Sequence, residues 1–570
     1  MTAKRMNGAQ ILLECLAREG VEVIYGYPGG VVLPLYHRFP EYPQLKHVLV
    51  RHEQGAAHAA DGYARASGRL GVCLATSGPG ATNLVTGIAT AWMDSVPLLA
   101  VTGNVARNLL GKDGFQEADI TGITMPITKH NYLVMDVDDL AYTVREAIYI
   151  ATTGRRGPVL VDIPKDVFID ETSFQWPEEV SVRGYKPTYH GHVGQMRKAA
   201  KLIDEARRPL ILAGHGVIAS GGHDALRDFA EKAGIPVLTT FLGIGSFPAD
   251  HVLSYGWMGM HGAYHANQAA NHADLIIAIG MRFDDRAMGR YSDFNPGCKI
   301  VHIDIDPAEI GKNLPVTVPI VGDVKVVLAG LIEEAKPNSH VEWLHWIDKV
   351  RTEHPSFTVP ETAGLSVQYA VRQIWEVTQG EAVVVTGVGQ HQMWVGQHYP
   401  FHRPRALISS GGLGTMGYEV PAAIGAAMAR PGEVVWSVCG DGGFQMTVQE
   451  LATAVDQDVN VKFAVMNNGY LGMVRQWQEL FYQHNYVSVD TARELCQPDF
   501  VKLAEAYGIP ARRATAQAEA RKAIEWAQAT PGPVLVEFVV EPEDNVWPMV
   551  PAGASLAETM EEPRPQEVRA

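Results

Sequence analysis

Cysteine is scarce in this sequence of 570 residues, and its five copies form no pattern. They lie far apart, are odd in number and include no Cys-x-x-Cys pair, which argues against a disulfide framework and against a zinc knuckle. Long apolar runs are missing too, since the apolar stretches have the length of a β-strand and fall well short of the roughly 20 residues that span a bilayer. The sequence therefore predicts a protein of a reducing compartment without a membrane segment.

Basic residues are outnumbered, with 47 Lys and Arg against 63 Asp and Glu and a net charge of −16. This balance argues against a general nucleic-acid binder, whose affinity depends on cations that neutralise phosphates. Only a few polar residues precede the amphipathic helix expected at residues 8–19, which leaves no room for a leader sequence. We expect a cytoplasmic protein that acts on a small molecule.

The length exceeds what one hydrophobic core supports, so about three domains are expected. Short β-branched runs alternate with helical patterns along the whole chain, which predicts the α/β class with three doubly wound parallel-sheet domains. Two irregular stretches, 171–195 and 350–365, separate the domains, which we place at residues 1–180, 190–345 and 365–550. A tail at 551–570 follows the last domain, and its part after Leu556 has little to bury and is expected to be mobile.

Two segments of the outer domains resemble each other. Residues 151–162 and 529–537 each follow a helical stretch, contain Gly-Pro and continue as a buried-strand pattern ending in an acid. This similarity suggests two related domains, although Gly-Pro often marks the turn before an apolar strand in unrelated segments. The sequence leaves both interpretations open.

Two polar loops follow buried strands in the last third of the chain. The expected strand 434–439 ends in Gly-Asp-Gly-Gly at 440–443, and the expected strand 461–466 ends in Asn-Asn-Gly-Tyr at 467–470. A helix from about residue 447 would join them, so the two strand ends can be neighbours where parallel sheets bind ligands. Glycines let backbone N–H groups approach phosphate oxygens, and carboxylate, amide and carbonyl oxygens suit Mg²⁺. The pattern predicts that these two loops, 440–443 and 467–470, form a clamp that holds a diphosphate through a divalent metal.

The first third offers an acid at a similar position. A strand expected at 47–50 ends in Arg-His-Glu at 51–53, and a helix of small residues follows at 54–62. Tight packing there would desolvate Glu53 and favour its protonated form, which can give a proton to a ring nitrogen. Taken alone, Glu53 could equally be a helix-start glutamate that faces the helix dipole.

The two loops and their separation resemble the signature of thiamine diphosphate enzymes, and the resemblance narrows to the acetohydroxyacid synthases, also called acetolactate synthases. It spans nearly the whole chain. The segments that carry it are Tyr-Pro-Gly-Gly at 27–30, Arg-His-Glu at 51–53, Thr-Ser-Gly-Pro-Gly-Ala-Thr-Asn at 76–83, Phe-Gln at 115–116, Val-Asp-Ile-Pro-Lys at 161–165, Gly-Met-His-Gly at 259–262, Met-Arg-Phe-Asp-Asp-Arg at 281–286, Val-Gly-Gln-His at 388–391, and Gly-Met-Val at 472–474 with Trp477.

The resemblance implies three domains that bind the pyrimidine, FAD and the diphosphate in chain order. It implies Glu53, Gly30, Gln116 and Lys165 as catalytic residues. The thiamine diphosphate contacts would be Gln390, His391, Gly414, Met416, Gly440, Asp441, Gly442, Gly443, Asn468 and Tyr470, with Asp441, Asn468 and Tyr470 also holding Mg²⁺. Phe115, Arg286, Met473 and Trp477 would meet the substrates, with Arg286 holding a carboxylate and Met416 bending the cofactor.

Members of this family with a biosynthetic role contain FAD although their main reaction has no net redox step. The residues that resemble the flavin contacts are Arg155, Gly214, Gly216, Thr240, Arg282, Asp285, Asp304 and Asp323. The Gly-x-Gly at 214–216 lacks the third glycine of the dinucleotide fingerprint and is weak evidence alone. Flavin-free catabolic relatives generally lack Arg-Phe-Asp-Asp-Arg, so its presence favours the FAD type.

The implied reaction is decarboxylation of pyruvate and transfer of its two-carbon unit to pyruvate or 2-ketobutyrate, the first common step of branched-chain amino-acid biosynthesis. The resemblance also implies a homodimer or dimer of dimers with active sites at the subunit interface, and leaves room for a small regulatory subunit. The alternatives are another thiamine diphosphate carboligase, decarboxylase or oxidase acting on 2-keto acids, and a scaffold that kept the fold without the activity.

Overall fold

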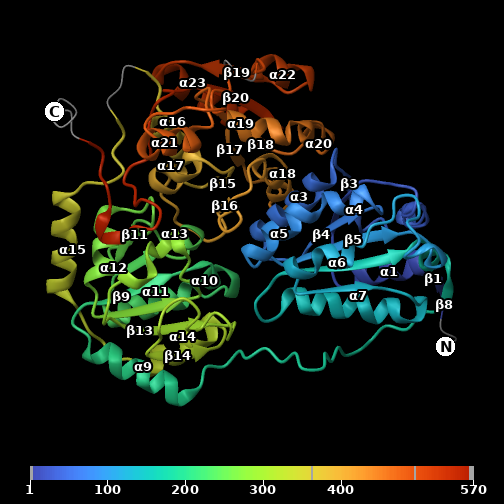
Figure 1. Cartoon of the computed structure of the whole chain (residues 1–570), viewed down its shortest axis with the longest axis horizontal. Helices are drawn as coiled ribbons and strands as arrows, with labels where there is room; N and C mark the ends of the chain where they lie inside the picture. Colours follow the sequence, from blue (N-terminus) through green and yellow to red (C-terminus); the bar gives the residue numbers. More distant parts are fainter. Residues whose placement is uncertain (1–3, 361–363, 493–495, 564–570) are drawn as a thin grey trace.

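The computed structural model describes residues 4–360, 364–492 and 496–563 and divides them into three α/β domains (Figure 1). Each domain contains one six-stranded sheet whose neighbouring strands all run parallel. The expected fold class is therefore confirmed. Among the described residues, no helix is both long and apolar enough to cross a membrane.

The N-terminal domain has its sheet in the order β3-β2-β4-β5-β7-β6. Every residue of β4, β5 and β7 is buried, as expected for parallel strands covered by helices on both faces. Asn7 and Gln10 form a capping box that starts the first helix, close to the predicted position. The strands are β2 (Val23–Gly26), β3 (Lys46–Leu49), β4 (Gly71–Ala75), β5 (Leu98–Asn104), β6 (His130–Leu133) and β7 (Pro158–Pro164), and the main helices are α1 (Gly8–Arg18), α3 (Glu53–Ser67), α5 (Val85–Met93) and α7 (Val137–Thr152).

The C-terminal domain repeats this topology. Its sheet has the order β16-β15-β17-β18-β20-β19, which matches the N-terminal sheet strand for strand when both are numbered along the chain. The two similar sequence segments lead into β7 and β20, the last strand of each sheet, which agrees with the interpretation as related domains. The strands are β15 (Val383–Thr386), β16 (Leu407–Ser409), β17 (Val435–Gly440), β18 (Val461–Asn467), β19 (Ala511–Ala514) and β20 (Val534–Val539), and the helices are α16 (Val367–Thr378), α17 (Gln390–His398), α18 (Glu419–Ala429), α19 (Asp441–Met446), α20 (Leu451–Asp456), α21 (Gly472–Phe481), α22 (Phe500–Ala506) and α23 (Gln517–Ala529).

The central domain has a different order, β11-β10-β9-β12-β13-β14. The chain moves outward from β9 in one direction and then restarts at β12 on its other side, which creates the crevice where doubly wound sheets bind dinucleotides. The strands are β9 (Pro209–Ala213), β10 (Val237–Thr239), β11 (Ser254–Trp257), β12 (Leu275–Ile279), β13 (Lys299–Asp304) and β14 (Val318–Val321), and the helices include α9 (Val193–Glu205), α10 (His215–Ser220), α11 (His223–Ala233), α12 (Tyr264–His272), α13 (Asp285–Met288), α14 (Val324–Glu334) and α15 (Val341–Glu353).

The N- and C-terminal domains meet through α3 and α18, which cross at very short range (Figure 1). A Cβ added at Gly62 would lie 2.2 Å from the Ala422 carbonyl oxygen, and one at Gly425 would lie 1.9 Å from the Ala59 carbonyl oxygen. Only residues without a side chain allow the two backbones to approach this closely. The small-residue helix noticed in the sequence is therefore a domain interface, and it carries Glu53 at its first turn.

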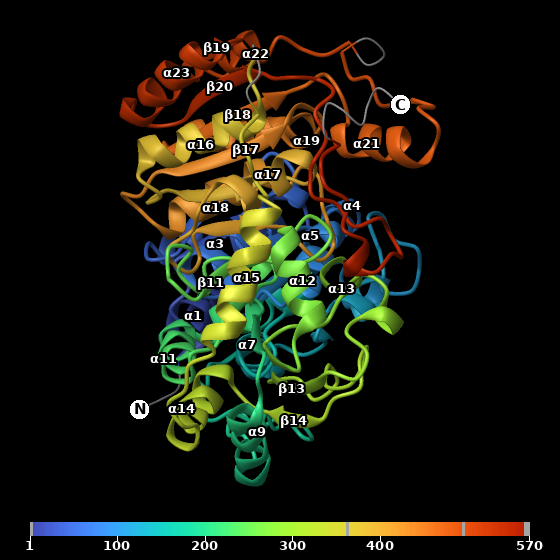
Figure 2. The same ribbon diagram turned by 90° about the vertical axis from the view of Figure 1, so that its left-hand side faces the viewer.

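The C-terminal tail differs from expectation. The residues after Leu556 were expected to be mobile, but residues 551–563 descend from the C-terminal domain and pack on the central domain near α13 (Figure 2). Leu556 is buried in a central-domain core cluster, and Met549 and Met560 exchange backbone hydrogen bonds. The burial of Leu556 and the backbone bonds of Met560 therefore attach this part of the tail to the body of the protein. The rest of the predicted tail, 564–570, lies outside the described residues.

Candidate active site

The two predicted loops stand side by side in the C-terminal domain. Strands β17 and β18 are parallel neighbours with Gly440 opposite Met466, so Asp441 and Asn468 follow adjacent strand ends. One prediction was wrong: the helix expected from about residue 447 begins already at Asp441, as α19. The buried strand end and the packing of Phe444 override the poor helix propensity of the glycines.

The Asp441 carboxyl is almost fully buried, and this desolvation raises its pKa to about 6. Among the described residues, two side chains donate to it: the Thr491 hydroxyl and the Gln497 amide both bond to Oδ2, each at 2.6 Å. On the second loop, Asn468 Oδ1 accepts a hydrogen bond from the Tyr470 backbone N–H at 3.1 Å, which shapes the turn. The oxygens of both loops thus gather at one edge of the sheet.

Buried polar atoms without partners surround this edge. Gln390 Oε1 and His391 Nε2 have no hydrogen-bond partner within the described residues. Both residues begin α17, and His391 lies so close to Gly440 that a Cβ there would meet its ring at 3.0 Å. Buried groups of this kind need a partner, and a ligand with oxygens and amino groups would supply one.

A small cavity of about 70 Å³ lies over the clamp. The predicted diphosphate contacts that line it are Gln390, His391, Met416, Gly440, Asp441, Gly442, Gly443, Asn468 and Tyr470. Gly414 does not line it; this residue borders the adjoining larger cavity, because the turn before Met416 faces the central domain. Met416 lines both cavities, which is the position expected of a residue beneath a ligand that extends from one to the other.

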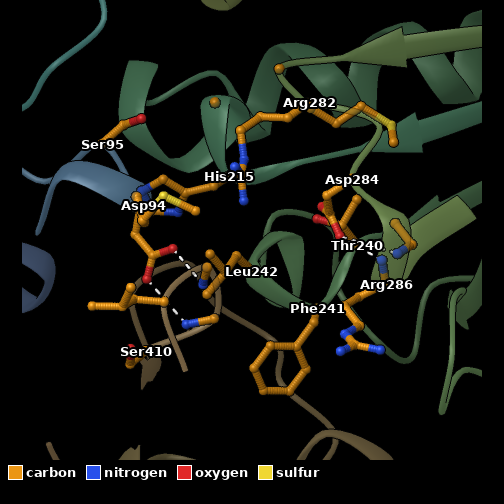
Figure 3. A pocket seen from close by; sticks show the side chains of 18 of the residues that line it. Asp94, Ser95, His215, Thr240, Phe241, Leu242, Arg282, Asp284, Arg286 and Ser410 are labelled. Carbon is orange, nitrogen blue, oxygen red and sulfur yellow. Dashed lines mark hydrogen bonds between the residues drawn. The ribbon is translucent and has the colours of Figure 1, made fainter. Parts of the chain in front are cut away.

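The larger cavity, of about 940 Å³, lies where the central and C-terminal domains meet, and residues of the N-terminal domain such as Asp94, Ser95 and Arg155 complete its wall (Figure 3). It opens at the carboxyl ends of the central strands, at the point where the strand order reverses. Of the predicted flavin contacts, Arg155, Gly216, Thr240, Arg282, Asp285, Asp304 and Asp323 line it. Its size and place suit a dinucleotide.

Gly214 is the predicted flavin contact that does not line this cavity. A Cβ on Gly214 would lie 2.2 Å from the Gly280 carbonyl oxygen, so the residue serves the close packing of the turns after β9 and β12. Asp304, at the end of β13, keeps a buried carboxyl whose desolvation raises its pKa to about 7. An acid at a strand end beside the crevice is typical of residues that bind a ribose hydroxyl.

The predicted substrate residues of the central and C-terminal domains share the larger cavity. Arg286, Met473 and Trp477 all line it, and the Arg286 guanidinium lies 5.9 Å from the centre of the Trp477 ring. Arg286 stays about half exposed, with its bidentate fork available to a carboxylate. The cavity therefore joins the dinucleotide crevice to a place where an anionic small molecule can bind.

The N-terminal candidates form a separate group. Glu53 is buried at the first turn of α3, where its Oε2 accepts a hydrogen bond from Asn83 Nδ2 at 2.9 Å. Gly80 packs against Glu53 and Thr76, and Gly78 packs against Gln116, whose φ of 59° is uncommon for a residue with a side chain. These contacts bring Glu53 and Gln116 to the same turn.

None of the N-terminal candidates for catalysis or substrate contact lines either cavity of this chain. This holds for Glu53, Gly30, Gln116, Lys165 and Phe115 in the part of the chain that the structure describes. Phe115 is 89% exposed although it is aromatic, and Lys165 is exposed as well. The predicted site is thus present as two halves that one chain does not bring together.

Sequence reasoning missed several cavity residues. Asp94 accepts hydrogen bonds from the backbone N–H groups of Gly411 and Gly412 (Figure 3), and also from Arg65, although no motif marks it. His215 projects into the same cavity, and desolvation, with a smaller contribution from Arg65, lowers the pKa of its imidazole to about 4. The Gly-x-Gly pattern could have pointed to His215, whereas Asp94 becomes visible only in the fold.

The donor atoms of the clamp fit a hard divalent cation. Among the described residues, no group of three or more His, Cys, Asp or Glu side chains could hold a metal alone. One buried carboxylate, one amide oxygen and a backbone carbonyl are instead the kind of incomplete oxygen set that Mg²⁺ shares with phosphate oxygens. The side chains of the site therefore suit a metal that arrives with a diphosphate.

Comparison with known proteins agrees with this geometry. Three family models match in succession: "Thiamine pyrophosphate enzyme, N-terminal TPP binding domain" over residues 6–123, the central domain of such enzymes over 196–331, and the "C-terminal TPP binding domain" over 387–538. The acetolactate synthase of Mycobacterium bovis is 50% identical over 562 residues, which cover 97% of this chain and 91% of that protein.

Relatives from other organisms give the same result. The acetolactate synthase large subunit of Corynebacterium glutamicum is 48% identical over 561 residues, covering 97% of this chain and 90% of the relative. The chloroplastic acetolactate synthase of Arabidopsis thaliana is 44% identical over 571 residues, covering 98% of this chain and 84% of the relative. The similarity therefore extends through all three domains.

Proposed function

The chain belongs to the acetolactate synthases, a family of thiamine diphosphate enzymes, and from that premise we propose that it decarboxylates pyruvate and transfers the two-carbon unit to a second 2-keto acid. With pyruvate as acceptor the products are 2-acetolactate and CO₂, and with 2-ketobutyrate they are 2-aceto-2-hydroxybutyrate and CO₂. The observation that carries the proposal is the placement of Asp441 and Asn468 at the adjacent ends of β17 and β18.

The clamp residues bind and orient the cofactor. Asp441 and Asn468 would hold Mg²⁺, while Gln390 and His391 would give their unpartnered atoms to the diphosphate. When bound, thiamine diphosphate supplies the carbon that attacks the keto group and accepts the electrons that CO₂ leaves behind. The remaining task of the protein is to place charges and exclude water.

Glu53 is the acid of the mechanism. Asn83 holds one carboxyl oxygen, Oε2, and Gly80 packs against the other, Oε1. A carboxyl held in this way would hold or give a proton at the ring nitrogen of a bound aminopyrimidine. Gln116 lies at the same turn and would face the reacting centre.

Substrate selection belongs to the larger cavity. Arg286 would bind the carboxylate of the acceptor, and Met473 and Trp477 would shape the space for its side chain. The dinucleotide crevice of the same cavity would hold FAD through Arg155, Thr240 and Asp304. Since the overall reaction transfers no electrons to an acceptor, we assign the flavin a structural part.

The two separated halves of the site, around Glu53 and around the clamp, would be completed by a second copy of the chain. Glu53 lies outside both cavities of its own chain, and exposed apolar side chains accompany the N-terminal candidates, among them Leu33 and Phe115. We propose that Glu53 of one subunit faces the clamp of its partner, giving a homodimer or dimer of dimers with shared sites.

The activity test identifies products. Purified protein is incubated with pyruvate, thiamine diphosphate, Mg²⁺ and FAD, with and without 2-ketobutyrate, and acetolactate and acetohydroxybutyrate are expected. Acetaldehyde or acetate as the main product would point instead to a decarboxylase or an oxidase, and no conversion at all would point to a scaffold.

The shared site has its own test. Glu53→Gln and Asp441→Asn variants, each inactive alone, are unfolded, mixed and refolded together. Mixed dimers contain one intact site, so about a quarter of wild-type activity should return. If the mixture stays inactive while refolded wild type recovers, each chain uses its own Glu53.

A further inference from the structure

The carboxylate of Asp441 is held by two residues that the mechanism above does not use. Thr491 Oγ1 and Gln497 Nε2 both donate to Oδ2, each at 2.6 Å. The Thr491 side chain is buried, with 1% of its surface exposed. Both donors follow α21, some 50 positions from Asp441 along the chain.

Thr491 and the residues just before it are also bonded to the second loop of the clamp, at 467–470. The Thr491 backbone N–H donates to the Gly469 carbonyl at 2.8 Å, and the Leu471 N–H donates to the Val489 carbonyl at 2.8 Å. An isolated antiparallel bridge joins Tyr470 to Asp490. Thr491 therefore braces the clamp, since its backbone holds the turn after Asn468 while its hydroxyl holds Asp441.

The oxygen that the two donors bond to determines which oxygen of the Asp441 carboxylate is left for a cation. Within the described residues, the side-chain donors to Asp441 both fall on Oδ2. Two donors on one oxygen keep the carboxylate from rotating and favour presentation of Oδ1 to a metal. Partners of this kind orient ligating carboxylates, and their removal typically weakens metal affinity by about 10- to 100-fold.

We propose that Thr491 and Gln497 are positioning residues that brace Asp441 for the Mg²⁺ of the thiamine diphosphate complex. This inference rests on the proposed function, because it assigns a role toward the metal of that same site. It also differs from the simplest rival account, in which the two donors merely occupy the carboxylate until a metal displaces them. The two accounts predict changes of opposite sign.

The test measures Mg²⁺ affinity. Cofactor-free, metal-free protein of full length is saturated with thiamine diphosphate and titrated with Mg²⁺, with binding followed by calorimetry and by tryptophan fluorescence. The variants are Thr491→Val, which keeps the shape but removes the hydroxyl, Thr491→Ser, which restores the hydroxyl, and Gln497→Met. Thr378→Val serves as matched control, because Thr378 is also buried in this domain but bonds to α16 and Tyr399.

The inference predicts that Thr491→Val and Gln497→Met each weaken Mg²⁺ binding by about 10-fold or more, while Thr491→Ser and Thr378→Val stay within about twofold of wild type. The turnover number at saturating Mg²⁺ should change far less than the Mg²⁺ concentration needed for half-maximal activity. Equal affinity in Thr491→Val and wild type would overturn the inference, and tighter binding would establish the rival account.

The same titration separates this inference from the proposed function. If wild-type protein with thiamine diphosphate binds no Mg²⁺, the proposed cofactor assembly fails before any variant is compared. If wild type binds Mg²⁺ and the brace variants match it, the brace alone is refuted. A brace variant that does not fold is recognised by its lost far-UV circular dichroism, and the other brace variant then decides the question.

Discussion

Glu419 is the least expected titratable group of the C-terminal domain. It begins α18, is fully buried, and no side chain in the described part of the chain hydrogen-bonds to either carboxyl oxygen. The carboxyl lies against two turns of the cofactor site: a Cβ added at Gly387 or Gly443 would come within 2.5 Å of it. Desolvation raises its pKa from 4.5 to about 7, and only the N–H groups of Gly417 and Glu419 oppose this.

A shift of this size corresponds to about 3 kcal/mol of preference for the neutral acid. Below about pH 4.5 the carboxyl is neutral in both folded and unfolded chains and costs nothing. As the pH rises the unfolded chain ionises first, so stability is lost between about pH 4.5 and 7 and does not fall further above that. The substitution Glu419→Gln removes the charge and keeps the shape.

We therefore expect Glu419→Gln to be within about 1 kcal/mol of wild type at pH 5 and more stable by up to about 3 kcal/mol at pH 8. For a domain of this size that is an increase of about 6 °C or more in Tm at pH 8. Scanning calorimetry of cofactor-free protein from pH 5 to 8 measures it.

Glu537→Gln is the matched control for this experiment. Glu537 is also buried but is paired with Arg513 and Asn467, each at 2.7 Å, so its loss should lower Tm at pH 8. A gap between Glu419→Gln and wild type that does not change with pH would refute the reasoning. So would a variant less stable than wild type at pH 8.

Three further predictions concern the site. Glu53→Gln should lower kcat by about 100-fold or more while thiamine diphosphate binding, followed by fluorescence, stays within about twofold; unchanged turnover would remove Glu53 from the mechanism. Arg286→Lys loses the bidentate fork, so KM for pyruvate should rise by about 10-fold with a smaller change in kcat, and an unchanged KM would exclude the carboxylate contact. Asp304→Ala should lower the flavin content of purified protein, measured by absorbance of released FAD, whereas Asp274→Ala at the opposite edge of the sheet should not; equal flavin in both variants would contradict the crevice assignment.

The strands of the fold could be predicted closely from the sequence. The runs 434–439 and 461–466 lie within one residue of β17 and β18, because a parallel strand buried on both faces is a short continuous apolar run. Helix starts were harder where glycine is frequent. A glycine-rich stretch has poor helix propensity, yet α19 starts at Asp441 because the strand end and the core around Phe444 determine the backbone.

The tail shows the converse limit. Its composition predicts mobility, since Pro and Glu give it little to bury on its own. Leu556, directly before this part of the tail, is nevertheless buried in a core cluster of the central domain, and composition carries no information about contacts with so distant a part of the chain.

The candidate site also contains some residues that the sequence reveals and others that only the fold reveals. Asp441 and Asn468 could be paired from the sequence because each follows a buried strand and one helical crossover connects them, so their neighbourhood is a local property of the chain. Thr491 could not be paired with Asp441, since residues 489–492 have no apolar period and reach the clamp through an antiparallel bridge to Tyr470. Motifs therefore reveal the atoms that would touch the cofactor, whereas the atoms that hold those residues in place depend on packing. Thr491 and Gln497 lie outside the motifs. A comparison restricted to the motifs would therefore not reveal the loss of metal affinity expected when either residue is substituted.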